Sequence, residues 1–469
     1  MNKSGLWLNA IEDRFGLLFY YQVAKKGGFG RGFYEIIHAD NPVWEAVNSW
    51  PYLSLAFLLS KLSLQTHRER EAFMNKKVVI AGSCRTAIGK MSGMLSTVPA
   101  AKLGEVVIRE AIKRAGIQPS DVDLVYMGCI LQAAQGQNVA RQAAVNAGIP
   151  VESPAVTINV VCGSGLEAVN MAARMILLGE ADVVVAGGME NMSAAAYALP
   201  QARAGYRLGN GTLVDTMVND GLTDAFSQLH MGITAENVAE QWGLTREELD
   251  DFSARSQQKA AKAQAEGKFV EEIVPVQIRI KRDVIDFIED EGIRGDATTD
   301  GLAKLKPAFK ADGVVTAGNA STINDGAAAV VVMSEEKARE LGVTPEAIWL
   351  GSALEGVEPA IMGIGPVAAT KKLMAKLGKT IADFDVIEGN EAFAAQSIAV
   401  LRDLGLDPTK VNVNGGAIAL GHPIGASGCR ILVSLIHEMN RQDDAKLGLA
   451  TLCIGGGMGC ATAIAKPGA

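Results

Sequence analysis

Two stretches far apart in this 469-residue chain follow the same plan. Residues 163–189 begin with Gly-Ser-Gly, continue as an alanine-rich helical pattern and a short apolar strand, and end in Gly-Gly-Met. Residues 425–458 begin with Gly-Ala-Ser-Gly, continue as a second helical pattern and a second strand, and end in Gly-Gly-Gly-Met. Because repetition of a whole supersecondary unit indicates duplication, the sequence predicts two similar halves.

Short β-branched runs alternate with helical patterns from Met74 onward. The strand-like runs include Val122–Met127 and Val183–Ala186, and a helical pattern covers Gly104–Ala115. This alternation is typical of a protein whose sheets are buried between helices. We therefore predict an α/β fold.

The segment between the two halves has a different character. Thr245 and Glu248 have the spacing of a capping box, which predicts a long helix that ends at Gly267, and polar, irregular residues follow from 280 to 312. We interpret this segment as an inserted loop and lid domain. The predicted division is 1–73 as an N-terminal extension, 74–194 and 321–344 as the N-terminal half, 195–320 as the lid, and 345–469 as the C-terminal half.

The first 73 residues differ in composition from the rest and hold about half of the aromatic residues. Met74 is followed by Asn-Lys-Lys and then by Val78–Gly82, which predicts a first buried strand. We expect Met74 to be the true start and residues 1–73 to be a mis-assigned extension, and the alternative is a genuine N-terminal extension. The apolar run Tyr52–Leu64 is interrupted by Lys61 and is shorter than the roughly 20 residues that span a bilayer. No membrane association is therefore expected.

Composition limits the compartment and the partners. With 48% hydrophobic and 20% charged residues, the chain is typical of a globular protein. A formal net charge of −8 argues against binding of nucleic acid, since phosphate backbones attract clustered Lys and Arg. The six cysteines form no Cys-x-x-Cys pair, so structural zinc and a disulfide framework are not expected. A reducing, cytoplasmic location fits this pattern.

Cys162 is the first candidate for chemistry. It follows the strand-like run Val156–Val161 and precedes Gly-Ser-Gly and a helix, and a cysteine at a helix N-terminus is expected to have a lowered pKa and to act as a nucleophile. The alternative is a buried structural cysteine. The same glycines match a weak dinucleotide fingerprint, but Asp182 begins the next strand rather than ending it, so no acidic residue is placed to hold a ribose.

His422 and Cys453 are the next candidates, and both lie in glycine-rich segments. His422 belongs to the segment 412–428, which lacks the Gly-Lys-Ser/Thr ending of a phosphate loop. Cys453 ends a strand and is followed by four glycines within residues 455–459, whose N–H groups can stabilise an oxyanion while the thiol acts as acid or base. Burial for packing is the alternative for each residue.

Asn390 and Glu391 follow the apolar run Phe384–Ile387. Polar side chains at the end of a strand are candidates for a site. The alternative is that Asn390 caps a helix predicted over Ala392–Leu401.

In this order and over about Lys77 to Ile464, these motifs resemble the thiolase family, and within it the biosynthetic acetyl-CoA acetyltransferases. The resemblance rests on several matching pieces, which are Arg85-Thr86, Cys162-Gly-Ser-Gly-Leu, Gly187-Gly-Met-Glu-Asn-Met192, His230-Met-Gly, Gly318-Asn-Ala-Ser321, Asn390-Glu-Ala-Phe-Ala, Gly421-His-Pro and Cys453-x-Gly-Gly-Gly. It implies a fold of two similar βα halves in a five-layered α-β-α-β-α core with an inserted lid.

The resemblance also implies an activity and roles for five residues. The reaction is reversible condensation of two acetyl-CoA to acetoacetyl-CoA and CoA through an acetyl-cysteine intermediate. Cys162 is the implied nucleophile, His422 activates it, and Cys453 removes the α-proton of the second acetyl-CoA. Asn390 holds a water at the enolate oxygen, and the N–H groups of Cys162 and Gly455 form a second oxyanion hole.

Substrate-binding positions follow from the same resemblance. Ser321 and Ala317 match the pantetheine channel, Arg294 matches a position near the adenine nucleotide, and Leu222 and Met231 border the acyl pocket. His230, Ala392 and Phe393 complete the expected set. Gly301 replaces a serine that contacts the nucleotide in the family, and Gly389 stands where a larger residue usually precedes Asn390.

The resemblance implies no metal and no cofactor beyond the CoA thioesters that are substrates, and it implies a homotetramer. The first alternative is a degradative 3-ketoacyl-CoA thiolase that uses the same residues on longer acyl chains. A second is a thiolase-like protein that binds acyl-CoA without turnover. Ketoacyl synthases are disfavoured, because they lack a second cysteine such as Cys453.

Overall fold

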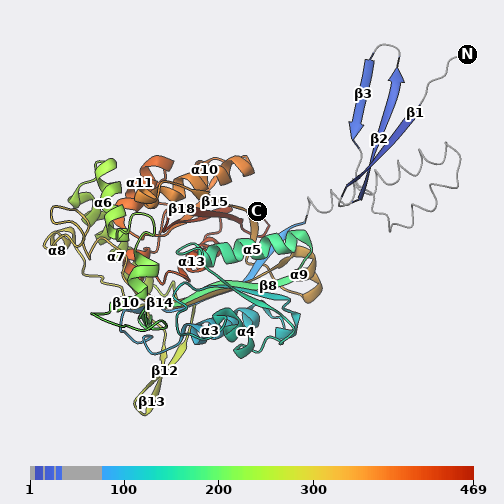
Figure 1. Cartoon of the computed structure of the whole chain (residues 1–469). Helices are drawn as coiled ribbons and strands as arrows, with labels where there is room; N and C mark the ends of the chain where they lie inside the picture. The colour runs from blue at the N-terminus through green and yellow to red at the C-terminus, as the bar shows by residue number, and fades with distance from the viewer. Residues whose placement is uncertain (1–5, 14–15, 26–27, 34–75, 469) are drawn as a thin grey trace, which may run out of the picture. The chain divides into compact units, whose positions relative to one another are not determined.

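The structure, a computed structural model, describes residues 6–13, 16–25, 28–33 and 76–468, and the chain divides into two units, Met1–Asn75 and Lys76–Ala469. In the first unit three strands form an antiparallel sheet in sequence order (Figure 1), with bounds β1 (Leu6–Asp13), β2 (Gly16–Lys25) and β3 (Gly28–Phe33). The run Tyr52–Leu64 and the expected start at Met74 lie outside the described residues.

The second unit contains one long mixed sheet whose two parts repeat the same arrangement. In the N-terminal part the strand order is β7-β6-β8-β14-β4, and in the C-terminal part it is β16-β17-β18-β15. The bounds are β4 (Val78–Thr86), β6 (Leu124–Gly128), β7 (Ala155–Ile158), β8 (Val183–Asn191), β14 (Asn324–Ser334), β15 (Ala347–Gly356), β16 (Val386–Gly389), β17 (Leu447–Ile454) and β18 (Met458–Ala465). Short strands β5 (Gly89–Lys90) and β11 (Ile273–Val274) add to β14 and β4.

The pairing directions reveal the duplication that the sequence predicts. In each half a parallel pair is followed by two antiparallel pairings, β6-β8-β14-β4 in the first half and β16-β17-β18-β15 in the second. Antiparallel pairing of β15 with β4, from Trp349 opposite Val78 to Ala347 opposite Ile80, joins the two halves into one hydrogen-bonded sheet. The division into two similar halves therefore arises from repeated topology as well as from repeated sequence.

Helices lie on both sides of each half of the sheet (Figure 1). Helices α3 (Ala100–Ala115) and α4 (Val139–Asn146) pack on the outer face of the N-terminal half, and α10 (Gly365–Leu377) and α11 (Ala394–Leu404) pack on that of the C-terminal half. Helices α5 (Ser164–Leu178) and α13 (Ser427–Arg441) lie between the two halves and share one core with strands of both. This arrangement is the five-layered core that the resemblance implies.

Helix α5 is apolar on most of its surface because both of its sides face a sheet. Within the described part of the chain, the stretch Val161–Leu178 is the one helical segment long and apolar enough to cross a membrane, and most of it is buried inside the protein.

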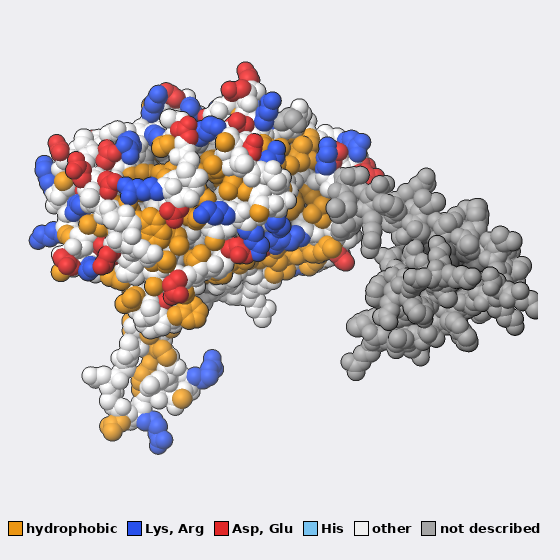
Figure 2. Space-filling view, turned by 90° about the horizontal axis from the view of Figure 1, so that it is seen from above, with side chains coloured by type: hydrophobic (Ala, Val, Ile, Leu, Met, Phe, Trp, Pro, Cys, Tyr) orange, Lys and Arg blue, Asp and Glu red, His pale blue; other side chains and the backbone are white. Residues whose placement is uncertain are grey.

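The segment predicted as a lid contains more regular structure than the sequence indicates. The capping box is present, because the side chains and backbone N–H groups of Thr245 and Glu248 bond reciprocally at the start of the long helix. The region predicted to be irregular from 280 to 312 instead contains strand β13 of a hairpin and a short helix. The elements of the segment are β9 (Tyr197–Ala198), β10 (Val214–Asp215), a π-helical turn (Met217–Leu222), α6 (Met231–Gln241), α7 (Arg246–Ala265), β12 (Val276–Ile280), β13 (Asp283–Phe287) and α8 (Thr299–Leu302). On the face shown in Figure 2, acidic and basic side chains are interspersed over the second unit.

Candidate active site

The loop that carries Cys162 has an unusual backbone conformation. Cys162 lies between β7 and α5, and Val161 before it has a positive φ of 43°. A β-branched residue adopts this conformation only where surrounding contacts enforce it. Ser164 supplies such contacts, because its hydroxyl accepts from the N–H of Val160 at 2.8 Å and donates to the carbonyl of Val161 at 2.7 Å. The loop therefore presents a partly exposed Cys162 thiol at the amino end of a buried helix.

Burial raises the pKa of Cys162 to about 11, and the nearby backbone N–H groups of Gly455 and of Cys162 itself only partly offset the effect. The predicted lowering of this pKa at the helix N-terminus is therefore wrong, because desolvation acts on a full charge whereas the helix end supplies partial charges. Near neutral pH Cys162 is a thiol that needs a base.

Cys453 lies near the end of β17, just before the glycine turn that leads to β18. Gly456 and Gly457 each have φ of 83°, a conformation that favours glycine and allows the tight turn. Burial raises the pKa of the Cys453 thiol far above its usual range, and the charge of Cys162 raises it further. A Cβ atom at Gly163 would lie 2.4 Å from Cδ1 of Ile454, so the residue after Cys162 touches the residue after Cys453 and the two thiols belong to one site.

His422 is buried and uncharged near neutral pH. Burial and the positive charge of Arg430 lower its pKa to about 3. The Nδ1 atom lies 2.6 Å from the hydroxyl oxygen of Ser427 and 3.4 Å from the amide nitrogen of Asn390. Among the described residues the Nε2 atom has no hydrogen-bond partner. His422 can therefore use Nε2 to take a proton.

Asn390 does not cap the following helix, which corrects the structural alternative drawn from the sequence. Helix α11 begins at Ala394, and the N–H of Phe393 before it donates to the side chain of Gln396 at 3.1 Å. Asn390 is instead buried next to the histidine, and its Oδ1 accepts from Arg430 at 3.2 Å. Its amide nitrogen faces His422.

The buried side chain of Glu190 joins the two halves. It binds the loop that contains His422 and Gly425, called here the histidine loop. Glu190 accepts the N–H of Gly425 at 2.9 Å and those of Ile130 and Leu131 at 3.1 Å. The carbonyl of Gly425 lies so close to Gly188 that a Cβ atom there would be 2.0 Å from it. The two halves thus meet at Gly425, three residues after His422, and this contact brings the histidine loop to the N-terminal half.

Four of the predicted substrate-binding residues pack with the two cysteines. Met231, Ala392 and Phe393 share a core cluster with Cys453, and Leu222 packs in the cluster that contains Cys162. Backbone pairing aligns two of the segments, because the N–H of Ser321 donates to the carbonyl of Ala392 at 2.9 Å.

Three aromatic rings pack in a row beside the predicted acyl pocket, and the sequence did not indicate the middle one, Phe309. His230 stacks on Phe309 with ring centroids 4.8 Å apart, and Phe309 meets Phe393 edge to face at 6.4 Å. Phe309 lies in the variable lid, where no local pattern marks it, so only the fold identifies it as part of the site.

A cleft beside the site contains two of the predicted CoA-binding residues. It is lined by Arg294 and Ala317 and also by Lys90 and Gln257, which sequence reasoning missed. The side chain of Gln257 accepts the backbone N–H of Arg294 at 2.7 Å and so fixes the loop that carries it. Two cationic side chains in one cleft suit a phosphate-bearing ligand.

Gly301, which replaces the family serine, lies outside this set of lining residues and donates its N–H to Thr298 at 3.1 Å. Across residues 76–468, no three His, Cys, Asp or Glu side chains are grouped as metal ligands.

Comparison with known proteins agrees with this geometry. The model of the thiolase N-terminal domain matches residues 78–336, and that of the thiolase C-terminal domain matches residues 343–466. The acetyl-CoA acetyltransferase of Chromobacterium violaceum is 60% identical over 392 residues, which cover 83% of this chain and 100% of that protein. That of Cupriavidus necator is 58% identical over 390 residues, with 83% and 99% covered.

A solved structure of a similar protein also matches this chain. The crystal structure of the Bacillus anthracis acetyl-CoA acetyltransferase superposes with a TM-score of 0.82 at 47% identity, and the match covers 83% of this chain and 99% of that one. Residues 78–466 contain both domain matches, and the cysteine, histidine and asparagine motifs all lie within them. The chain belongs to the thiolase family.

Proposed function

We propose that this chain is an acetyl-CoA C-acetyltransferase that condenses two acetyl-CoA to acetoacetyl-CoA and CoA, and that it runs in both directions. The observation that supports the proposal is that the loops carrying Cys162 and Cys453 meet, because a Cβ atom at Gly163 would lie 2.4 Å from Cδ1 of Ile454 and one at Gly455 would lie 3.5 Å from Cγ1 of Val161. Two thiols beside a neutral imidazole can divide acyl transfer and proton transfer between them.

In the first half-reaction, Nε2 of His422 takes the proton of the Cys162 thiol while the sulfur attacks the thioester carbonyl of acetyl-CoA. The raised pKa of Cys162 and the lowered pKa of His422 keep both groups neutral before acetyl-CoA binds, so the proton moves to His422 only as the sulfur attacks. The N–H groups of Cys162 and Gly455 stabilise the oxyanion. The carbon–sulfur bond to CoA then breaks, and the CoA sulfur takes the proton of Cys453.

In the second half-reaction, the Cys453 thiolate removes the α-proton of a second acetyl-CoA. Its raised pKa makes the thiolate a strong base. Protonated His422 and a water held by Asn390 stabilise the enolate oxygen. The enolate carbon attacks the acetyl carbon of acetyl-Cys162, the bond to sulfur breaks, and the sulfur recovers its proton from His422. All protons are thereby restored.

CoA is expected to bind in the cleft that Arg294 lines and to reach from there to the cysteines. Arg294 and Ala317 line the cleft, whereas Ser321 lies beside Ala392 near the thiols. Met231 and Phe393 pack in the cluster that contains Cys453, and Leu222 packs beside Cys162, which supports placing the acyl group among these side chains. We also propose that the enzyme needs no metal or cofactor, acts in the cytoplasm and forms a homotetramer, and light scattering on the purified chain tests the last point.

Thiolysis by CoA tests the substrate directly, comparing acetoacetyl-CoA with a 3-ketoacyl-CoA of about ten carbons. We expect a strong preference in kcat/KM for acetoacetyl-CoA. Equal or better turnover of the long chain would instead make this a degradative 3-ketoacyl-CoA thiolase. Binding of acyl-CoA without thiolysis of either substrate would overturn the enzymatic proposal.

A further inference from the structure

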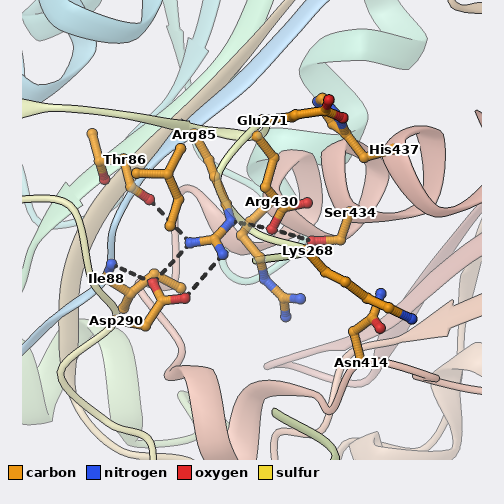
Figure 3. Close-up of polar contacts among 12 residues, drawn as sticks. Arg85, Thr86, Ile88, Lys268, Glu271, Asp290, Asn414, Arg430, Ser434 and His437 are labelled. Carbon is orange, nitrogen blue, oxygen red and sulfur yellow. Dashed lines mark hydrogen bonds and ion pairs between the residues drawn. The ribbon is translucent and has the colours of Figure 1, made fainter. Parts of the chain in front are cut away.

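Two buried arginines lie next to the site, and only one of them is fully paired. Arg85 on β4 makes two hydrogen bonds with Asp290, at 2.8 and 2.9 Å, and one of 2.7 Å with Glu272. Arg430 on α13 is 2% exposed and makes one hydrogen bond, to Oδ1 of Asn390. Figure 3 shows the dashed lines that converge on Arg85, with the guanidinium of Arg430 nearby.

The remaining groups of Arg430 are poorly satisfied. Its Nη1 atom lies 3.7 Å from Oε2 of Glu388, and in the described part of the chain neither Nη1 nor Nε has a hydrogen-bond partner. An arginine buried with so few bonds destabilises a fold relative to an apolar side chain of similar volume. Packing alone therefore does not explain a guanidinium at this position.

The one bond that Arg430 makes decides how Asn390 is oriented. A guanidinium only donates, so it holds the amide oxygen and turns the amide nitrogen toward His422, 3.4 Å from Nδ1. A flipped amide would set its nitrogen against the guanidinium donors. Arg430 thus determines which end of the Asn390 amide faces the site.

The charge of Arg430 also acts on the imidazole. It adds to burial in lowering the pKa of His422. The ionisable groups around the guanidinium are Glu388 on β16, Glu391 just after it, Glu272 before β11, and Arg85 on β4. Burial and the positive charge of Arg85 lower the pKa of Arg430, and the carboxylates partly offset this effect.

We infer that Arg430 is a positioning residue for the condensation step, acting by holding the amide of Asn390. The inference rests on the proposed function, in which Asn390 serves the enolate oxygen and is not needed for transfer of the first acetyl group. Loss of Arg430 should therefore damage the two half-reactions unequally.

The test uses Arg430→Lys in the full chain, with Arg85→Lys as the matched control, since both residues are buried arginines. Two rates are measured, formation of acetyl-Cys162 by mass spectrometry and formation of acetoacetyl-CoA at saturating acetyl-CoA. For R430K we expect the second rate to fall about tenfold more than the first, as when one interaction made only in the transition state is lost. For R85K we expect lower stability with no change in this ratio.

A double-mutant cycle shows whether Arg430 acts through Asn390. If it does, R430K combined with N390A should condense acetyl-CoA no more slowly than N390A alone. Additive losses, or equal losses in both half-reactions, would overturn the inference. If the wild-type chain itself forms no acetyl-Cys162, the proposed function fails instead, and the two failures are thus distinguished.

A stability measurement keeps the inference testable if R430K does not fold. In Asn390→Asp the lone partner of the buried guanidinium becomes an anion, so we expect a higher midpoint of urea unfolding than for Asn390→Leu, together with loss of condensation. N390D unfolding no later than N390L would contradict the contact on which the inference depends.

Discussion

The Nδ1 atom of His422 lies 2.6 Å from the hydroxyl oxygen of Ser427, and that hydroxyl donates its single proton to the carbonyl of Pro423, 2.9 Å away. With its proton already used, the hydroxyl can only accept from the imidazole. In this arrangement the proton of the neutral ring is assigned to Nδ1, and the 3.4 Å contact with Asn390 is too long to compete. Nε2 is left with a free lone pair.

Ser427→Ala tests this assignment. We expect kcat for both half-reactions to fall about tenfold, because the lost hydrogen bond holds the base in its active tautomer. Ser253→Ala is the matched control, since Ser253 is also buried and donates to the carbonyl four residues earlier, at 2.7 Å, but does not contact His422. Unchanged rates in S427A would show that the tautomer is fixed by another group.

Alkylation of Cys162 by iodoacetamide reports its protonation state. Because its pKa is raised to about 11, we expect the rate constant to rise about tenfold per pH unit between about pH 7 and about pH 9.5, without a plateau. Cys162→Ala gives the background from the other cysteines. A plateau below about pH 8.5 would restore the lowered pKa first expected at this helix N-terminus.

The fold and four site motifs could be predicted because local patterns mark them. Cys162, Cys453 and Asn390 each follow an apolar run, and such positions lie at the ends of buried strands. The repeat of strand, helix and glycine turn predicted the two halves, which the pairing directions now explain.

What could not be predicted depends on contacts between segments far apart in the chain. Arg430 appears in the sequence as one polar residue of a helix, and Lys90 as one residue of a turn, because neither pattern shows what the fold sets opposite them. The pKa of Cys162 was predicted in the wrong direction for the same reason, since burial depends on packing of the whole molecule and not on the helix that follows.

Cys453→Ala separates the two half-reactions. CoA leaves as a stable thiolate that needs little help from an acid, so we expect acetylation of Cys162 to slow less than about tenfold. Condensation should fall about a thousandfold, because no other base is placed to remove the α-proton. Cys162→Ala should abolish acetylation. Labelled acetyl still bound to C162A, or equal loss of both steps in C453A, would refute these roles.

Glu190 makes the stability of the fold depend on pH. Burial raises its pKa from 4.5 to about 7, so the stability it contributes is fully present below about pH 4.5 and is lost as the pH rises through about 7. Relative to Glu190→Gln, we expect the free energy of unfolding of the wild type to decrease by about 3 kcal/mol at most across this window. Urea unfolding of both proteins at about pH 5 and about pH 8 measures the difference. Parallel pH dependences would show that Glu190 does not titrate in this range.

Two glycine substitutions test how closely the halves approach. In Gly188→Ala the new Cβ atom would lie 2.0 Å from the carbonyl oxygen of Gly425, so the backbone of the histidine loop must move, and we expect a loss of about 3 kcal/mol or more in unfolding free energy. Gly389→Ala is the matched control, because its Cβ would meet no atom within 4 Å. There we expect a gain of about 0.5 kcal/mol from reduced freedom of the unfolded chain, with kcat unchanged. The free energies of unfolding of the two variants are compared by urea unfolding. If G188A were as stable as G389A, the backbone at Gly425 would not lie as close to Gly188 as the 2.0 Å contact indicates.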